Sequence, residues 1–178
     1  MKHAAAPDAL AANTAFACIT TLLDATHAAY TLHEHAPSVT IEDADANLWF
    51  PVERLVKTIA FRVKGGGYVL AGLCGYQQVD YKKLAAVVGV NRTQIMRLTP
   101  AEIEAELGYV VGGVAPFALN ESVRVVLDAG VLAWNSIYCG TGRTDRTLEI
   151  APGDLVRVTQ AAVVCLAKDQ ALSSVQTS

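Results

Sequence analysis

The sequence lacks a long uninterrupted apolar run. Hydrophobic residues make up 52% of the 178 positions, but a charged residue or a histidine interrupts each stretch before it reaches the roughly 18 residues that a membrane helix needs. The alanine-rich first dozen residues also lack the basic flank and continuous apolar segment of a signal peptide. We therefore expect a cytoplasmic protein without a membrane segment, in which residues 1–12 form a loose tail.

Closely spaced cysteines are also missing. Cys18, Cys74, Cys139 and Cys165 form no pair with metal-ligand spacing, and a chain of this size needs no disulfide framework. No histidine follows His35, so neither Cys74 nor Cys139 has a nearby base in the sequence. We expect both to be small core residues, and we expect no metal and no cofactor. A thiol-dependent enzyme is the weaker alternative.

Two histidines, His33 and His35, raise the question of a metal site. They lie two residues apart in a short β-prone segment and would share one face of a strand. No third ligand follows nearby in the sequence, so a polar, exposed strand end is favoured over a metal site.

An excess of positive charge is absent as well. The net charge of −3 excludes a protein that coats nucleic acid without specificity. Any contact with RNA must be local, and the basic residues considered for it are Lys64, Lys82, Lys83, Arg92, Arg143 and Arg146.

What is present is an interleaved series of helix and strand signals. Apolar periodicity and capping residues predict five helices. One runs from residues 13–14 to about 27, one begins at 40, one spans 80–88, one spans 99–108 and one begins at 152. Alternating and β-branched segments predict strands at 30–33, 57–63, 68–73, 123–127, 136–139 and 147–150, with a glycine turn at 65–67. The hairpin and the short connections then favour an α+β fold, a single domain over residues 13–168 with a mixed or antiparallel sheet. Residues 169–178 are expected to form a second loose tail.

Two features do not fit ordinary surface or core positions. Lys57 opens an apolar strand, which suits either a snorkelling edge lysine or a functional one. The segment YVVGGVAP, residues 109–116, places Gly112, Gly113 and Pro116 after two valines. Such glycines either make a bulge in a strand or let a ligand or another segment approach the backbone closely. Residue chemistry alone leaves the question of Lys57 open, whereas spacing alone favours a bulge or tight bend for the glycines.

Several blocks of sequence, in collinear order, resemble the YbaK and prolyl-tRNA synthetase editing-domain family of aminoacyl-tRNA deacylases. These blocks are VKTIAF around Lys57, QVDYKKLAAVVG at 78–89, LTPAEIEAELGYVVGGVAP at 98–116 and IYCGTGRTDRTLEIAPGDL at 137–155. The resemblance covers roughly residues 22–155. It departs from the family at Ala115, where many relatives have serine, and in the turn GTGRTD.

The resemblance implies an α+β domain with a mixed, mostly antiparallel, barrel-like sheet flanked by helices. It also implies a pocket that takes the amino acid and the terminal adenosine at the 3′ end of a mischarged tRNA and hydrolyses the ester. Lys57 matches the lysine that orients the substrate, and the loop with Gly112 and Gly113 matches the segment whose backbone meets the ester carbonyl. The other residues matched to the substrate pocket are Ala115, Pro116, Gly140, Gly142 and Arg143. Arg143 is the basic residue that we expect to contact the substrate, because it lies in the turn that closes the pocket.

The expected substrate is tRNA(Pro) carrying cysteine or alanine, and the partner suggested by the resemblance is prolyl-tRNA synthetase. The alternative is a non-catalytic module that binds the tRNA end, to which Ala115 and the altered turn would point. The sequence does not specify the oligomeric state.

Overall fold

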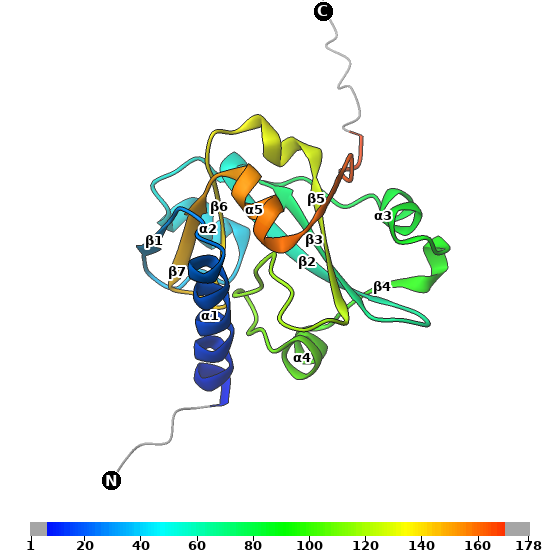
Figure 1. Cartoon of the computed structure of the whole chain (residues 1–178), viewed down its shortest axis with the longest axis horizontal. Coiled ribbons are helices and arrows are strands. Elements are labelled where there is room, and N and C mark those ends of the chain that lie inside the picture. The colour runs from blue at the N-terminus through cyan, green and yellow to red at the C-terminus, as the bar shows by residue number, and fades with distance from the viewer. Residues whose placement is uncertain (1–6, 170–178) are drawn as a thin grey trace, which may run out of the picture.

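A glycine-tipped hairpin forms the centre of the fold (Figure 1). The computed structural model describes residues 7–169. Strands β2 (Leu55–Val63) and β3 (Tyr68–Cys74) pair antiparallel along almost their full length. In the turn between them, Gly65 and Gly67 have φ angles of +93° and +74°, which glycine adopts without a clash at Cβ. The predicted hairpin is therefore confirmed.

Within the described residues, eight strands form one mixed sheet. The others are β1 (Tyr30–Glu34), β4 (Ile95–Arg97), β5 (Val123–Asp128), β6 (Ile137–Gly140), β7 (Arg146–Ile150) and β8 (Ala162–Val164). The strand order is β1-β7-β6-β2-β3-β5-β8, and β4 pairs with β2 beside this path. Pairs β1·β7, β6·β7, β2·β3 and β2·β4 are antiparallel, whereas β2·β6, β3·β5 and β5·β8 are parallel. This is the mixed, mostly antiparallel α+β architecture that the sequence predicts.

The central hairpin is buried on both faces. Val56, Ala60 and Leu70 point into one core cluster, whereas Phe61 and Val69 point into the other. Successive side chains of a strand alternate between faces, so each residue of β2 belongs to one side or the other. This alternation decides which side chains of β2 reach which cavity.

Five α-helices flank the sheet in the described part of the chain. They are α1 (Pro7–Ala25), α2 (Ile41–Asn47), α3 (Tyr81–Val88), α4 (Pro100–Glu102) and α5 (Pro152–Thr159). The predicted caps are confirmed: Asp80 accepts hydrogen bonds from the first turn of α3, and Gly89 ends that helix with φ +76°. Short helical turns η1 (Val52–Arg54), η2 (Arg92–Gln94), η3 (Ile103–Leu107) and η4 (Ala129–Ala133) lie between strands.

Two predicted helices differ from the structure, and two strands were not predicted. Helix α1 begins at Pro7 and not near Asn13, because proline suits the first helical position and the following alanines favour helix. Only residues 1–6 of the predicted N-terminal tail, and 170–178 of the C-terminal one, lie outside the described residues. The helix predicted for residues 99–108 keeps its Thr99 cap and Gly108 end but widens into a π-helical turn at η3. Strands β4 and β8 have three residues each and were not predicted.

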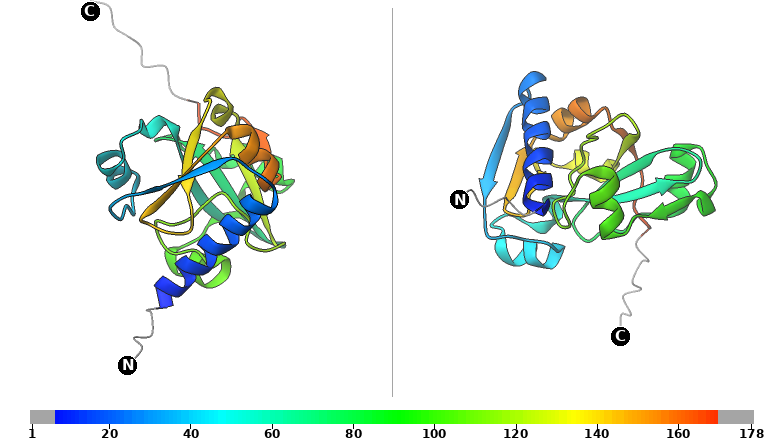
Figure 2. Two further views of the ribbon diagram at one scale, coloured as in Figure 1. Left: turned by 60° about the vertical axis from the view of Figure 1, so that its left-hand side comes forward. Right: turned by 90° about the horizontal axis from the view of Figure 1, so that it is seen from below.

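The elements are spread along the longest axis of the molecule. Helix α1 lies beside β1 and β7 at one end, and β4 and α3 lie at the other (Figures 1 and 2). None of the helices within residues 7–169 combines the length and apolar character needed to span a membrane.

Candidate active site

A gap in the sheet opens beside the middle of β2. On the edge away from β3, β2 pairs with β6 only at Leu55 and Val56, and with β4 only from Phe61 to Val63. In the described part of the chain, no strand pairs with Lys57, Thr58 or Ile59 on that edge. A cavity of about 380 Å³ lies at this gap, a size typical of small-molecule sites.

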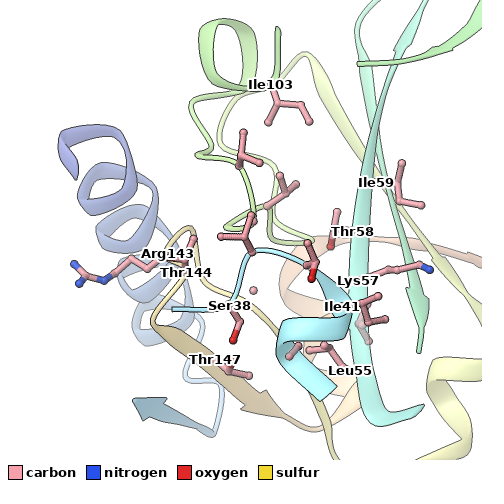
Figure 3. A pocket seen from close by; sticks show the side chains of 18 of the residues that line it. Ser38, Ile41, Leu55, Lys57, Thr58, Ile59, Ile103, Arg143, Thr144 and Thr147 are labelled. Atoms are coloured by element: carbon pink, nitrogen blue, oxygen red, sulfur yellow. The ribbon is translucent and has the colours of Figure 1, made fainter. Parts of the chain in front are cut away.

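Four segments besides β2 line the cavity: residues 35–48 around the start of α2, residues 97–103 from the end of β4 to η3, the loop before β5, and the turn between β6 and β7 (Figure 3). Its apolar lining includes Ile41, Ala44, Leu55, Ile59, Ile103 and Val114. Its hydroxyl groups come from Ser38, Thr40, Thr58, Thr144 and Thr147. The cavity is thus largely apolar with several hydroxyl groups that can orient a bound molecule.

The loop formed by residues 109–117 is one wall of the cavity. It is an irregular loop, not the strand interrupted by a bulge that composition and spacing favoured. The buried Tyr109 hydroxyl donates to the Phe117 carbonyl at 2.7 Å and closes the loop. Inside it, the Gly113 N–H donates to the Val110 carbonyl at 3.0 Å. These bonds fix the backbone of the loop without help from a sheet.

The loop packs backbone to backbone against the turn after β6. The Gly142 N–H donates to the Gly113 carbonyl at 2.9 Å. A Cβ atom on Gly113 would lie 2.7 Å from the Gly142 carbonyl oxygen, and one on Gly140 would lie 2.6 Å from the Val114 carbonyl oxygen. Side chains do not fit at these distances. The two glycine-containing segments expected to share a site are therefore neighbours, and glycine is what allows their contact.

The start of α2 forms the opposite lip of the cavity. Gly112, at φ +78°, would place a Cβ atom 2.7 Å from the Val39 Cα. The N–H groups of Val39 and Thr40 donate to the Asp43 carboxylate at 3.1 and 3.0 Å. Hydrogen bonds from the Thr40 backbone, and then from Val39, lower the pKa of Asp43. This capping box fixes the backbone of the lip.

Lys57 and Thr58 point to opposite sides of β2 (Figure 3). The Lys57 ammonium points away from the glycine loop, although the residue lines the cavity. Burial lowers the pKa of Lys57, and the positive charge of Arg97 lowers it further, whereas Glu42 acts in the opposite direction. The buried Thr58 hydroxyl has no hydrogen-bond partner within the described residues. An unpartnered hydroxyl at a cavity is free to bind a ligand.

Arg143 does not present its guanidinium to the cavity. The guanidinium forms a bidentate pair with Asp145 at 2.8 and 2.9 Å and also donates to the Asn13 amide of α1. It lies 5.9 Å from the centroid of the Phe16 ring. Figure 3 shows the side chain extending outward from its turn. Arg143 thus fastens α1 to the turn, and it also lines the cavity.

The other predicted site residues divide into two groups. Gly112 and Gly140 line the cavity, whereas Gly113, Ala115, Pro116 and Gly142 do not. Ala115 is fully buried in the core and Pro116 is buried beside it. These four residues support the wall from behind, so Ala115 and Pro116 do not offer side chains to a ligand in this geometry.

Sequence reasoning missed a histidine at the cavity. His35 Nδ1 lies 2.7 Å from the Ala36 carbonyl oxygen, which fixes Nδ1 as a donor, and Nε2 lies 2.8 Å from the Thr147 hydroxyl. His33, expected to be exposed, is instead partly buried with Nε2 2.8 Å from the Glu149 carboxylate. Among residues 7–169, no three potential ligands lie close enough together to hold a metal ion.

The buried cysteines are core residues. Cys74 and Cys139 are 7% and 0% exposed. Burial raises the pKa of Cys74 to about 11, with a further contribution from Asp128. Burial alone raises the pKa of Cys139 well above its ordinary value. Neither thiol is activated as a nucleophile needs to be.

Comparison with known proteins adds to this geometry. A family model described as an aminoacyl-tRNA editing domain matches residues 35–158, which include every residue that lines the cavity. The chain is 27% identical to the uncharacterized protein YwhH of Bacillus subtilis (strain 168), over 66% of this chain and 73% of that protein. It is 30% identical to the multifunctional Ser/Thr-tRNA deacylase ProXp-y of Escherichia coli (strain K12), over 61% of this chain and 66% of that protein. The crystal structure of hypothetical protein APE2540 matches with a TM-score of 0.77 and 26% identity, over 85% of this chain and 99% of that one.

Proposed function

Because this chain belongs to the family of aminoacyl-tRNA editing domains, we propose that it hydrolyses the ester of mischarged tRNA. The observation that carries the proposal is the contact between two glycine segments at the cavity, where the Gly142 N–H meets the Gly113 carbonyl at 2.9 Å. This contact holds an irregular backbone segment rigidly beside a gap in the sheet. Such a wall suits a reaction that depends on backbone donors.

In the proposed reaction, water adds to the carbonyl carbon of the ester and the carbonyl oxygen becomes an oxyanion. The bond between the carbonyl carbon and the ribose oxygen then breaks. A proton from the attacking water passes to the ribose oxygen, and the free amino acid leaves. The N–H group of Val114, a residue that lines the cavity, donates to no backbone acceptor within residues 7–169. We assign it to the oxyanion, where a pre-positioned donor lowers the barrier without a side-chain acid or base. A ribose hydroxyl of the substrate holds the attacking water.

Lys57 takes a positioning role in this proposal. Its ammonium lies on the far side of β2 from the glycine loop, at the border of the cavity. From there it contacts the ribose and phosphate side of the terminal nucleotide while the amino acid occupies the cavity. Its charge orients the substrate and does not act on the ester carbonyl.

For the substrate we propose cysteine or alanine attached to tRNA(Pro), removed in trans alongside prolyl-tRNA synthetase. A second candidate is serine, because the buried Thr58 hydroxyl lacks a partner in the described structure and could bond a hydroxyl of the substrate. The name of the Escherichia coli relative, a Ser/Thr-tRNA deacylase, supports the same candidate.

The test is a deacylation panel in which one tRNA(Pro) is charged in turn with alanine, cysteine, serine and proline. We expect the wild-type protein to release at least one of the first three faster than Lys57→Ala does. If the wild-type protein releases none of these three amino acids faster than Lys57→Ala does, the proposal is wrong. Tight binding of a non-hydrolysable charged-tRNA analogue without any release would identify the non-catalytic alternative.

Thr58→Val separates the two substrate candidates. If the hydroxyl bonds serine, the variant lowers kcat/KM for serine by about threefold to tenfold, the effect of one hydrogen bond. Release of alanine should not change, since alanine offers no partner. Equal effects on both amino acids would remove Thr58 from substrate selection.

A further inference from the structure

A second cavity of about 660 Å³ adjoins the first on the Lys57 side of β2. The two cavities share residues 39–41, residues 57–59 and Arg97 as lining. A chain-like ligand can therefore extend from one into the other past Lys57.

The lining of the second cavity carries positive charge only. It contains Lys57, Arg97 and Lys168 and no Asp or Glu, although the whole chain has a net charge of −3. Within residues 7–169, none of these three cations takes part in a salt bridge. The Glu42 carboxylate, outside this lining, offsets part of the Lys57 charge, and the three cations together leave the cavity positive, which attracts an anion.

Lys168 is held at the cavity by buried structure. The carboxylate of Asp128, 5% exposed, accepts hydrogen bonds from the Leu166 and Ala167 N–H groups at 2.7 and 2.9 Å. The Lys168 backbone N–H donates to the Gln78 carbonyl at 2.8 Å, and its ammonium donates to the Gln78 side-chain oxygen at 3.0 Å. Lys168 lies beyond residues 35–158, the part of the chain that the family model matches. This cation is thus supplied by a segment outside the matched domain.

We infer that the second cavity binds the phosphodiester backbone of the RNA strand immediately before its 3′-terminal adenosine. The inference rests on the proposed function, which places the amino acid in the first cavity and the ribose and phosphate side of the terminal nucleotide at Lys57. The phosphate on the 5′ side of that adenosine then lies toward Lys57, and the preceding one toward Arg97 and Lys168. A positive groove that follows the backbone is how proteins bind single-stranded RNA without reading its sequence.

The experiment measures binding of an uncharged, fluorescein-labelled RNA oligonucleotide ending in CCA, by anisotropy at several salt concentrations. Two neutralised phosphates predict a slope of log K against log salt of about −1.4, at about −0.7 for each phosphate of a single strand. Arg97→Gln and Lys168→Gln should each weaken binding by up to about fivefold. The double variant should reduce the slope to about −0.7, since one contact remains. Arg124→Gln, an exposed charge on β5 outside both cavities, is the matched control.

Unchanged affinity and slope in the double variant would overturn the inference. Displacement of the RNA by inorganic phosphate or AMP at equal concentration would also overturn it, because the site would then bind free anions. Deacylation by the wild-type protein is measured in parallel. Charge-dependent RNA binding without deacylation would contradict the proposed function alone, whereas deacylation with charge-independent binding would contradict this inference alone.

Discussion

Replacing Gly112 by alanine tests whether the glycine loop and the lip of the cavity touch as the structure shows. Gly112 has φ +78°, and a Cβ atom there would lie 2.7 Å from the Val39 Cα and 3.1 Å from the Val39 carbonyl oxygen. Gly108 is the matched control, because it has φ +72° and no atom within 4 Å of the added Cβ. Both variants place an alanine in an unfavourable left-handed backbone conformation. Only Gly112→Ala also forces the loop away from the start of α2.

The left-handed conformation costs an alanine about 1–2 kcal/mol. Overpacking against a backbone adds about 1–3 kcal/mol. The free energy of unfolding should therefore fall by about 1–2 kcal/mol in Gly108→Ala and by about 2–5 kcal/mol in Gly112→Ala, measured by urea denaturation. Gly112→Ala should also slow deacylation, since the mouth of the cavity widens, while Gly108→Ala should keep the wild-type rate. Equal losses of stability in the two variants would refute the contact.

Three further predictions concern buried and partly buried side chains. Tyr109→Phe removes the buried bond to the Phe117 carbonyl and should lower the free energy of unfolding by about 1–3 kcal/mol, measured by urea denaturation. Lys57→Met should raise stability at neutral pH while slowing deacylation, because burial lowers the native pKa of Lys57 below the ordinary 10.5 and the unfolded chain binds the proton more tightly. That gain should disappear as the pH rises through the window up to 10.5, and a gain independent of pH would contradict the cause. The double variant Cys74→Ala with Cys139→Ala should retain wild-type deacylation per folded molecule, and loss of turnover would restore the thiol-dependent alternative.

Features of the fold that depend on local chemistry were predictable from the sequence. Asp80 and Gly89 bracket α3 because one accepts from the first turn and the other adopts a left-handed φ. The same reasoning identified the hairpin and the Thr99 cap. The start of α1 was misplaced because Asn13 resembles a cap, whereas the alanines before it continue the helix from Pro7.

The sequence did not predict which cavity each side chain of β2 faces. Both faces of the strand are buried, so alternation separates Lys57 from Thr58 but does not say which side holds which cavity. The gap in the sheet that exposes these residues arises because β4 and β6 pair with different parts of one edge. Such pairings join distant segments and leave no local signature in the sequence.

The candidate site was predictable only in part for the same reason. The resemblance brought together the loop and the turn that Gly113 and Gly142 now join. It did not indicate that Ala115 is fully buried or that Arg143 binds Asp145 and α1. Those outcomes depend on the direction of each side chain, which follows from packing in three dimensions.

The measurement that tests the central claim most directly is single-turnover deacylation with the mouth of the cavity blocked. Val111 lines the cavity and is 46% exposed, so Val111→Trp adds bulk there without disturbing the core. Leu132→Trp is the control, at a residue that is 52% exposed and outside the cavity. We predict that Val111→Trp slows release of the amino acid by about tenfold or more, while Leu132→Trp keeps the wild-type rate. Equal rates in the two variants, or no release by the wild-type protein above the uncatalysed rate, would contradict the claim.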